Sequence, residues 1–115
     1  MQADQLFNEL NPITSAAYTS SGDSGILTGA GAITMMRAYV IVASRSGTNP
    51  TLDIVIEDTP DGTNWFNCGT FTQMTAAGTQ VIDITKAFAS RWHVKYTIGG
   101  TATPTFTFGV WVTAK

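Results

Sequence analysis

The residues best suited to chemistry lie in the segment IVIEDTPDGTNWFNCGTFT, which runs from Ile54 to Thr72. Glu57, Asp58 and Asp61, with the carbonyl groups between the two aspartates, offer the hard oxygen ligands that Ca²⁺ prefers. Ca²⁺ takes about six to eight oxygens, however, and this spacing matches no EF-hand loop. An incomplete ligand set of this kind does not predict a metal site.

A bend between two strands accounts for the same segment. Ile56 ends an inward-facing series, and Thr59-Pro60 interrupts the backbone ladder because proline has no N–H to donate. Asp61-Gly62 is a common turn pair. We expect Trp65 or Phe66 to begin the next strand by capping the core. The segment is therefore interpreted as a bend.

Two further patterns suggest nucleophilic chemistry. SGDSG (21–25) resembles the nucleophile segment of chymotrypsin-like proteases, but those enzymes have their His and Asp before the Ser. The only histidine here, His93, lies far downstream. We therefore expect a turn at Asp23 to Gly25 and no catalytic serine.

Cys68 and His93 could in principle form a thiolate–base pair. His93 lies between Arg91 and Lys95, on a strand face that we expect to be exposed, without an obvious carboxylate to orient it. Cys68 lies in an expected strand, where a buried structural cysteine is usual. One His and one Cys also cannot complete a zinc site, and GAGAI (29–33) lacks the lysine and helix of a phosphate loop. We predict no catalytic, cofactor-binding or metal-binding residue and no enzymatic activity.

The composition of the chain indicates what kind of surface surrounds these residues. The chain has 115 residues, 43% of them hydrophobic, which is enough for one domain with a real core. Only 12% are charged, against roughly 25% in ordinary soluble domains. Residues 62–82 and 96–114 carry no charge, and 19 threonines take the place of charged residues. We infer that other protein covers much of this surface in the working state.

The remaining composition limits partners and location. A net charge of −2 argues against nucleic acid as a partner. The first residues, MQADQLFNEL, do not resemble a signal peptide, and no apolar run approaches a membrane span of about 20 residues. A single cysteine suits a chain made in a reducing cytoplasm. We expect neither a nucleic-acid nor a membrane partner.

From residue 34 onward, hydrophobic residues alternate with a period of two, as in β-strands. The expected strands are 35–44, 51–58, 65–73, 79–85, 91–98 and 105–115, with a short turn or helix at KAFAS (86–90). Their inward series are Met36, Ala38, Val40 and Val42, then Leu52, Ile54 and Ile56, then Trp92, Val94, Tyr96 and Ile98, and finally Phe106, Phe108, Val110 and Val112. Separated by Gly, Pro and Asx turns, these strands predict an all-β fold, a single antiparallel β-sandwich with a jelly-roll-like arrangement at 34–115.

Three outward-facing positions are unexpectedly apolar. Tyr39 and Ile41 make the second face of the 35–44 strand apolar, which is typical of a central strand covered on both sides. Trp111 lies opposite the inward Phe/Val series of its strand. It could stack on a sugar, cover the second face of the sheet or fill a subunit interface, and we favour the interface because exposed aromatic residues mark contact sites.

Residues 1–33 differ in pattern and are assigned to an N-terminal arm and linker. Ala3, Leu6, Phe7 and Leu10 follow helical spacing, so the arm is expected to be extended or to form a short helix. Such a helix could pack on its own domain, or the arm could dock on a neighbouring subunit. Leu6, Phe7 and Leu10 join Trp111 as the predicted interface residues.

The segments from DGTNW (61–65) to RWHVKYTIGGTATPTFTF (91–108) resemble small β-sandwich virion proteins of tailed bacteriophages. The matching residues are Asp61, Gly62, Thr63, Asn64, Trp65, Arg91, Trp92, Val94, Tyr96, Gly99, Gly100, Thr101, Pro104, Phe106 and Phe108, and the resemblance covers roughly residues 32–115. Such proteins decorate heads, form necks and tails, or bind receptors, and a DGTNW hairpin also occurs in discoidin-like sugar-binding sandwiches.

This resemblance implies a non-enzymatic virion structural protein that is made in the host cytoplasm and located at the capsid surface. The expected role is a head decoration (cement) protein. Its expected partners are the major capsid protein and further copies of itself, as a trimer or dimer. Alternatives are a tail or neck ring subunit and a carbohydrate-binding receptor-recognition module that uses Trp111 and the Asp58/Asp61 loop.

Overall fold

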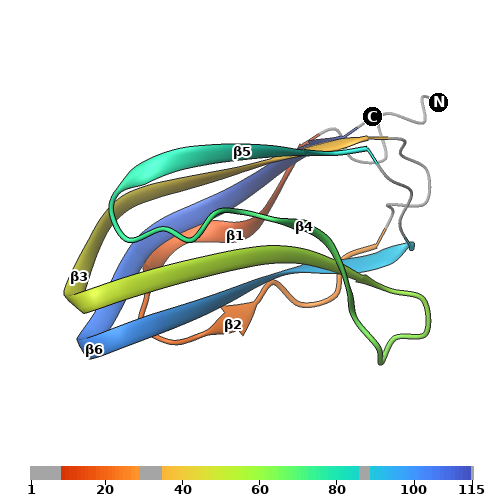
Figure 1. Ribbon diagram of the computed structural model, residues 1–115. Coiled ribbons are helices and arrows are strands. Elements are labelled where there is room, and N and C mark those ends of the chain that lie inside the picture. The colour runs from red at the N-terminus through yellow and green to blue at the C-terminus, as the bar shows by residue number, and fades with distance from the viewer. Residues whose placement is uncertain (1–8, 29–34, 86–88, 115) are drawn as a thin grey trace.

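The protein is an all-β, two-layer antiparallel sandwich in the computed structural model, which describes residues 9–28, 35–85 and 89–114 (Figure 1). The strands are β1 (Glu9–Tyr18), β2 (Gly22–Asp23), β3 (Met36–Thr59), β4 (Phe66–Thr70), β5 (Gly78–Ile84) and β6 (Arg91–Ala114). Within these ranges the chain forms no helix, and hence none that could cross a membrane. The turn or helix expected at 86–90 falls mostly outside the described residues.

Two long strands form the frame of the sandwich. β3 and β6 pair antiparallel over their whole lengths, from Met36 opposite Ala114 to Thr59 opposite Arg91. Both bend in the middle, at one end of the molecule, so the paired ribbon folds over on itself (Figure 1). One half of each strand lies in the first layer and the other half in the second.

Close backbone contact shapes the bend. Gly47 has a φ of 104°, and a Cβ there would lie 2.7 Å from the Cα of Pro104. Gly100 has a φ of 119°, and a Cβ there would lie 2.9 Å from the Cα of Pro50. Only glycine allows both the positive φ and the close approach of the two strands. The bend thus depends on one glycine in each strand.

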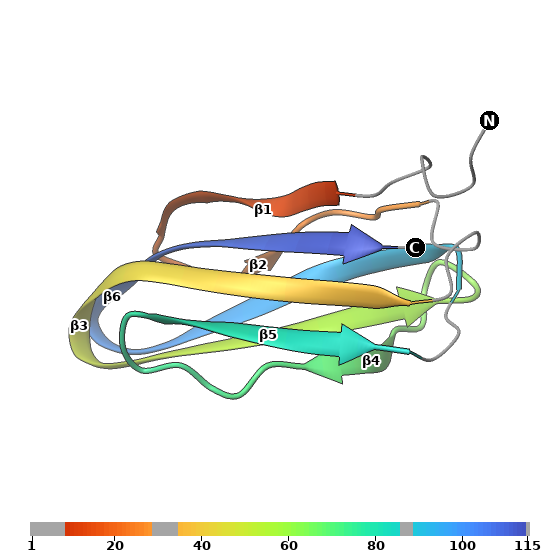
Figure 2. The ribbon, with the colours of Figure 1, turned by 90° about the horizontal axis from the view of Figure 1, so that it is seen from above.

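The shorter strands complete the layers. In the first layer β1, β6, β3 and β5 lie side by side, as Figure 2 shows from above. In the second layer the order is β2, β6, β3 and β4. This is the arrangement of a jelly roll, in which a folded ribbon of strands makes both sheets. The predicted fold class is confirmed.

The core lies between the layers and follows the predicted alternation. The buried apolar residues that form the core cluster are Ile13, Met36, Ala38, Val40, Val42, Leu52, Ile54, Ile56, Phe71, Met74, Ile84, Trp92, Val94, Tyr96, Phe106, Phe108, Val110 and Val112. Every predicted inward residue belongs to this set except Ile98, which is half-buried and packs against it. Period-two patterning therefore identified the core face of each long strand.

The start of the sandwich includes part of the stretch assigned to an arm and linker at 1–33. Residues 9–18 form β1, and Leu10 pairs with Val112 and packs against the core. Leu10 is therefore in extended rather than helical backbone. Leu6 and Phe7 lie outside the described residues, so their predicted role stays a prediction.

Candidate functional site

The Asp61 loop, which raised the possibility of a metal site, binds its own backbone. The Asp61 carboxylate accepts hydrogen bonds from the backbone N–H groups of Thr63 and Asn64, both at 2.8 Å, and from the Asn64 side-chain amide at 2.6 Å. These donors lower the pKa of Asp61 well below its usual value because they stabilise the charged form. The loop joins β3, which ends at Thr59, to β4, which begins at Phe66, so the predicted bend is confirmed.

The aromatic residues after this loop do not cap the core, contrary to expectation. Phe66 begins β4, but its side chain is 56% exposed. The Trp65 ring stacks on the His93 ring with centroids 3.7 Å apart and planes within 3°. Trp65 therefore covers the outer face of the second layer, since the turn at Asp61-Gly62 directs it over β6.

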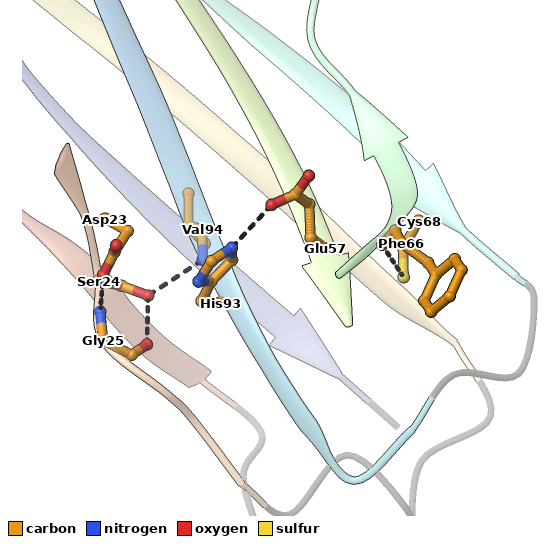
Figure 3. A network of polar contacts seen from close by, with 8 residues as sticks. All are labelled: Asp23, Ser24, Gly25, Glu57, Phe66, Cys68, His93 and Val94. Atoms are coloured by element: carbon orange, nitrogen blue, oxygen red, sulfur yellow. Dashed lines mark hydrogen bonds and ion pairs between the residues drawn. The ribbon is translucent and has the colours of Figure 1, made fainter. Parts of the chain in front are cut away.

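The prediction that His93 is exposed and has no carboxylate partner is wrong. It is only 7% exposed, and its Nε2 lies 2.8 Å from Oε1 of Glu57 on the neighbouring strand β3 (Figure 3). Glu57 and His93 are direct cross-strand partners. This pairing could have been found in the sequence only if the register of two distant strands were known.

Cys68 does not complete a catalytic pair with His93. Cys68 is on β4, separated from β6 by β3, and packs against the core, whereas His93 is on the outer face of the layer. In the described ranges, no three His, Cys, Asp or Glu side chains gather as a metal-binding group. The His93–Glu57–Trp65 cluster therefore has an evident structural function, which is to fasten the bend loop onto the second layer.

The outer face of the first layer is the best candidate for a functional site. Tyr39 lies between Trp111 on β6 and Val81 on β5, and Ile41 follows on the same face of β3. We call these four residues the Trp111 face. The side chains of Ile41 and Val81 are 46% and 52% exposed. Ile41 is therefore not covered as expected, while Tyr39 is half-buried, and among the residues that the structure describes no further layer lies over this face.

A shallow groove of about 710 Å³ lies along the Trp111 face. Arg37, Val40, Thr79 and Gln80 complete its lining. Nε of Arg37 lies 2.7 Å from Oδ1 of Asp83, and both side chains are more than half exposed. The hydrogen bond from Arg37 lowers the pKa of Asp83, so this pair stays charged but electrically balanced. The groove is mostly apolar, with a neutral ion pair at its rim.

Gly109 positions the Trp111 ring on this face. A Cβ built on Gly109 would lie 2.7 Å from Cη2 and 3.0 Å from Cζ3 of Trp111. The six-membered ring of the indole therefore lies over the Cα of Gly109, two residues back along β6. Since Gly109 presents no side chain, the indole can lie down along the strand rather than stand away from it. The Gly-x-Trp spacing was visible in the sequence, but its meaning depends on the indole's direction.

Of the predicted interface residues that the structure describes, only Trp111 is on an outer face. It is half-buried, as an aromatic ring laid on a sheet should be. Leu10 instead joins the edge of the core. Val81 is exposed and completes the Trp111 face. The sequence did not single it out, because the alternation in its strand is typical of an ordinary edge strand.

No family model matches the chain, and no curated protein matches its sequence. The CBM22-1 xylan-binding domain of Paenibacillus barcinonensis Xyn10C is structurally similar, with 8% identity, a TM-score of 0.55, and coverage of 92% of this chain and 81% of that domain. This likeness shows a shared β-sandwich fold.

Two other solved structures are similar at lower scores. The Yersinia pseudotuberculosis-derived mitogen is 13% identical, with a TM-score of 0.49 and coverage of 95% of this chain and 87% of the mitogen. A chain of Broad Bean Stain Virus is 13% identical, with a TM-score of 0.47 and coverage of 84% of this chain and 58% of the viral one.

Proposed function

We propose that the chain is a non-enzymatic virion structural protein, a head decoration protein that docks through the Trp111 face. The observation that carries this proposal is the apolar outer face that exposed Ile41 and Val81 form with half-buried Tyr39 and Trp111 on three neighbouring strands. Exposed apolar patches of this kind mark interaction sites more often than chance allows. The major capsid protein and other copies of the chain are the proposed partners.

Burial of this face gives a useful binding energy for a protein present in many copies. About half of the Ile41 and Val81 side chains remains to be buried. Removing that area from water contributes about 1 kcal/mol for each residue. Trp111 and Tyr39 add further area at the centre, where aromatic residues dominate binding. A protein that binds only the assembled capsid stabilises the assembled state, so many copies of this chain would reinforce the capsid.

The resemblance of the DGTNW and RWHVKYTIGG segments to phage virion proteins supports the same proposal. The low charge supports it as well, because a surface that is covered in the particle needs little charge for solubility. Residues 1–8 precede β1 at the edge of the first layer, and the proposed arm, with Leu6 and Phe7, would add contacts to a neighbouring subunit. The proposed location is the outer surface of the capsid.

Cosedimentation with capsids tests the proposal. The full chain is mixed with capsids of the phage that encodes it and separated on a sucrose gradient. Ile41→Thr/Val81→Thr should weaken binding about 10- to 30-fold, since it removes about 2 kcal/mol of apolar burial while keeping β-branched residues on the strands. Phe66→Thr is the matched control, because Phe66 is equally exposed but belongs to the second layer.

Two results would contradict the proposal. Equal binding by the double variant and the unchanged chain would show that the Trp111 face is not the docking surface. Assembly of the purified chain into rings without any capsid would instead support a tail or neck ring subunit.

A carbohydrate-binding domain is the second candidate, and the position of Trp111 favours it. An indole lying along a sheet can stack on a sugar ring, while the Thr79 hydroxyl and the Arg37–Asp83 pair offer hydrogen-bonding groups to a sugar at the groove rim. The structurally similar CBM22-1 domain binds xylan. Titration with xylo-oligosaccharides and a glycan array would detect this activity, and binding that Trp111→Ala abolishes would favour it over the virion role.

A further inference from the structure

The free edge of β5 is a second surface that a partner can use. β5 pairs with β3 on one side, and in the part of the chain that the structure describes no strand pairs with its other side. Figure 2 shows β5 as the outermost strand of the first layer. Backbone groups alternate in direction along a strand, so every second residue of β5 turns its N–H and C=O away from β3. A row of such groups is a template for another strand.

Within the described residues the sandwich has four edge strands, and they differ in how well they are protected against pairing. β1 contains Pro12 and has two register shifts against β6. β2 has only two residues, and β4 has five residues and a register shift. Proline, bulges and short length are the features that keep edges from pairing. β5 has none of them, since its seven residues keep a continuous register with β3.

We propose that β5 pairs antiparallel with β5 of a second copy, about a two-fold axis at Val81. This register overlaps all seven residues of the strand. Val81 then lies opposite Val81 of the second copy, and Thr79 lies opposite Asp83. The same surface serves both copies, as a two-fold interface requires, and the two first layers become one continuous sheet of eight strands.

The charge pattern of β5 fits a second copy. Asp83 is the only charged residue of the strand, and Thr79 opposite it can donate a hydrogen bond to the carboxylate. The two Asp83 side chains are then four residues apart along the strands, about 13 Å at about 3.3 Å per residue. That separation exceeds the Debye length of about 8 Å at physiological ionic strength. Arg37 already balances each Asp83 within its own copy.

The pairing also extends the Trp111 face. Val81 of each copy lies at the junction, so the apolar residues of the two copies form one continuous surface across the dimer. The dimer uses backbone hydrogen bonds and therefore does not depend on the proposed virion role. If that role is correct, a dimer that docks on the capsid buries two Trp111 faces at once. Because the β5 pairing links the two faces, the dimer binds with higher avidity than a monomer.

A charge exchange at Val81 tests the dimer. Sedimentation velocity of the full chain should give a dimer. Val81→Lys and Val81→Glu should each weaken self-association at least tenfold, because like charges would lie opposite one another in the dimer only. An equimolar mixture of the two variants should restore the dimer, since Lys then lies opposite Glu. Val81→Thr is the matched control and should remain dimeric.

Several outcomes would overturn the proposal. The first is that the unchanged chain is a monomer. The second is that both charged variants dimerise as strongly as the unchanged chain. The third is that the mixture stays monomeric although circular dichroism shows both variants to be folded. Hydrogen exchange of the unchanged chain gives a test without mutation. Amides of residues 79–83 should exchange more slowly as the concentration rises, and exchange that is independent of concentration would contradict pairing.

The dimer and the docking proposal fail in different ways. Ile41→Thr/Val81→Thr should bind capsids about 10- to 30-fold more weakly but stay dimeric. A dimer that does not bind capsids refutes only the virion role, and a monomer that binds them refutes only the β5 pairing.

Discussion

Replacement of Gly109 by alanine tests the placement of the Trp111 indole. The new Cβ would lie 2.7 Å from Cη2 of Trp111, far closer than the usual carbon–carbon contact of about 3.5–4.0 Å. The indole must therefore move by about 1 Å or leave the sheet. Overpacking of this kind costs about 1 to 3 kcal/mol. The backbone of Gly109 is not in the left-handed region, so alanine brings no φ strain of its own.

A double-mutant cycle with Trp111→Ala separates this clash from other effects. Without the indole, Gly109→Ala should cost about 1 to 3 kcal/mol less than it costs in the unchanged chain, because the clash with Trp111 is removed. A contact of 3.1 Å to the backbone N of Ser15 is present in both backgrounds and cancels. Urea unfolding followed by circular dichroism measures each free energy. An equal loss of stability in both backgrounds would refute the argument that Gly109 makes room for the indole.

Two further predictions concern the bend and the loop. Gly47→Ala should destabilise the fold by at least about 2 kcal/mol in thermal or urea unfolding, because a positive φ and a backbone clash with Pro104 act together. Gly25→Ala is the control, because Gly25 has a φ of 78° but a Cβ there would have nothing within 4 Å. This substitution should cost only about 1 kcal/mol. Equal losses of stability in the two variants would contradict the role of the close approach between the strands. Asp61 has a lowered pKa in the folded chain, so its stabilising effect is complete above the usual Asp pKa of about 4 and is lost as the pH falls below it. Asp61→Asn should therefore be less stable than the unchanged chain at pH 7, and this difference in the free energy of unfolding should shrink below pH 4. An equal difference at pH 7 and pH 2.5 would contradict the claim that the charged Asp61 carboxylate stabilises the loop.

The sequence predicted the strands from residue 35 onward well, because a sandwich strand repeats every two residues, but it did not predict β1, which lies in the stretch assigned to the arm. The inward series of β3 and β6 were visible as alternating apolar residues, and so was the outward direction of Trp111. The sequence did not reveal that 35–44 and 51–58 are one strand, or that 91–98 and 105–115 are one. Continuity through the bend depends partly on positive φ angles at Asn49, Ala102 and Thr103, for which these residue types give little signal.

The candidate site was predictable only in part, because its residues come together through long-range pairing. Tyr39 was recognised as apolar and outward, but its neighbours on β5 and β6 are more than 40 and 70 residues away, at Val81 and Trp111. The same reason explains the wrong expectation for His93. Its partner Glu57 is 36 residues away, and only the register of β3 against β6 brings them together.

If the proposed virion role is correct, electron cryo-microscopy of the virus particle should show copies of this chain on the outside of the capsid. Tyr39, Ile41, Val81 and Trp111 should then be buried against another subunit. A map in which these four side chains face solvent, or in which the chain is absent from the particle, would contradict that role.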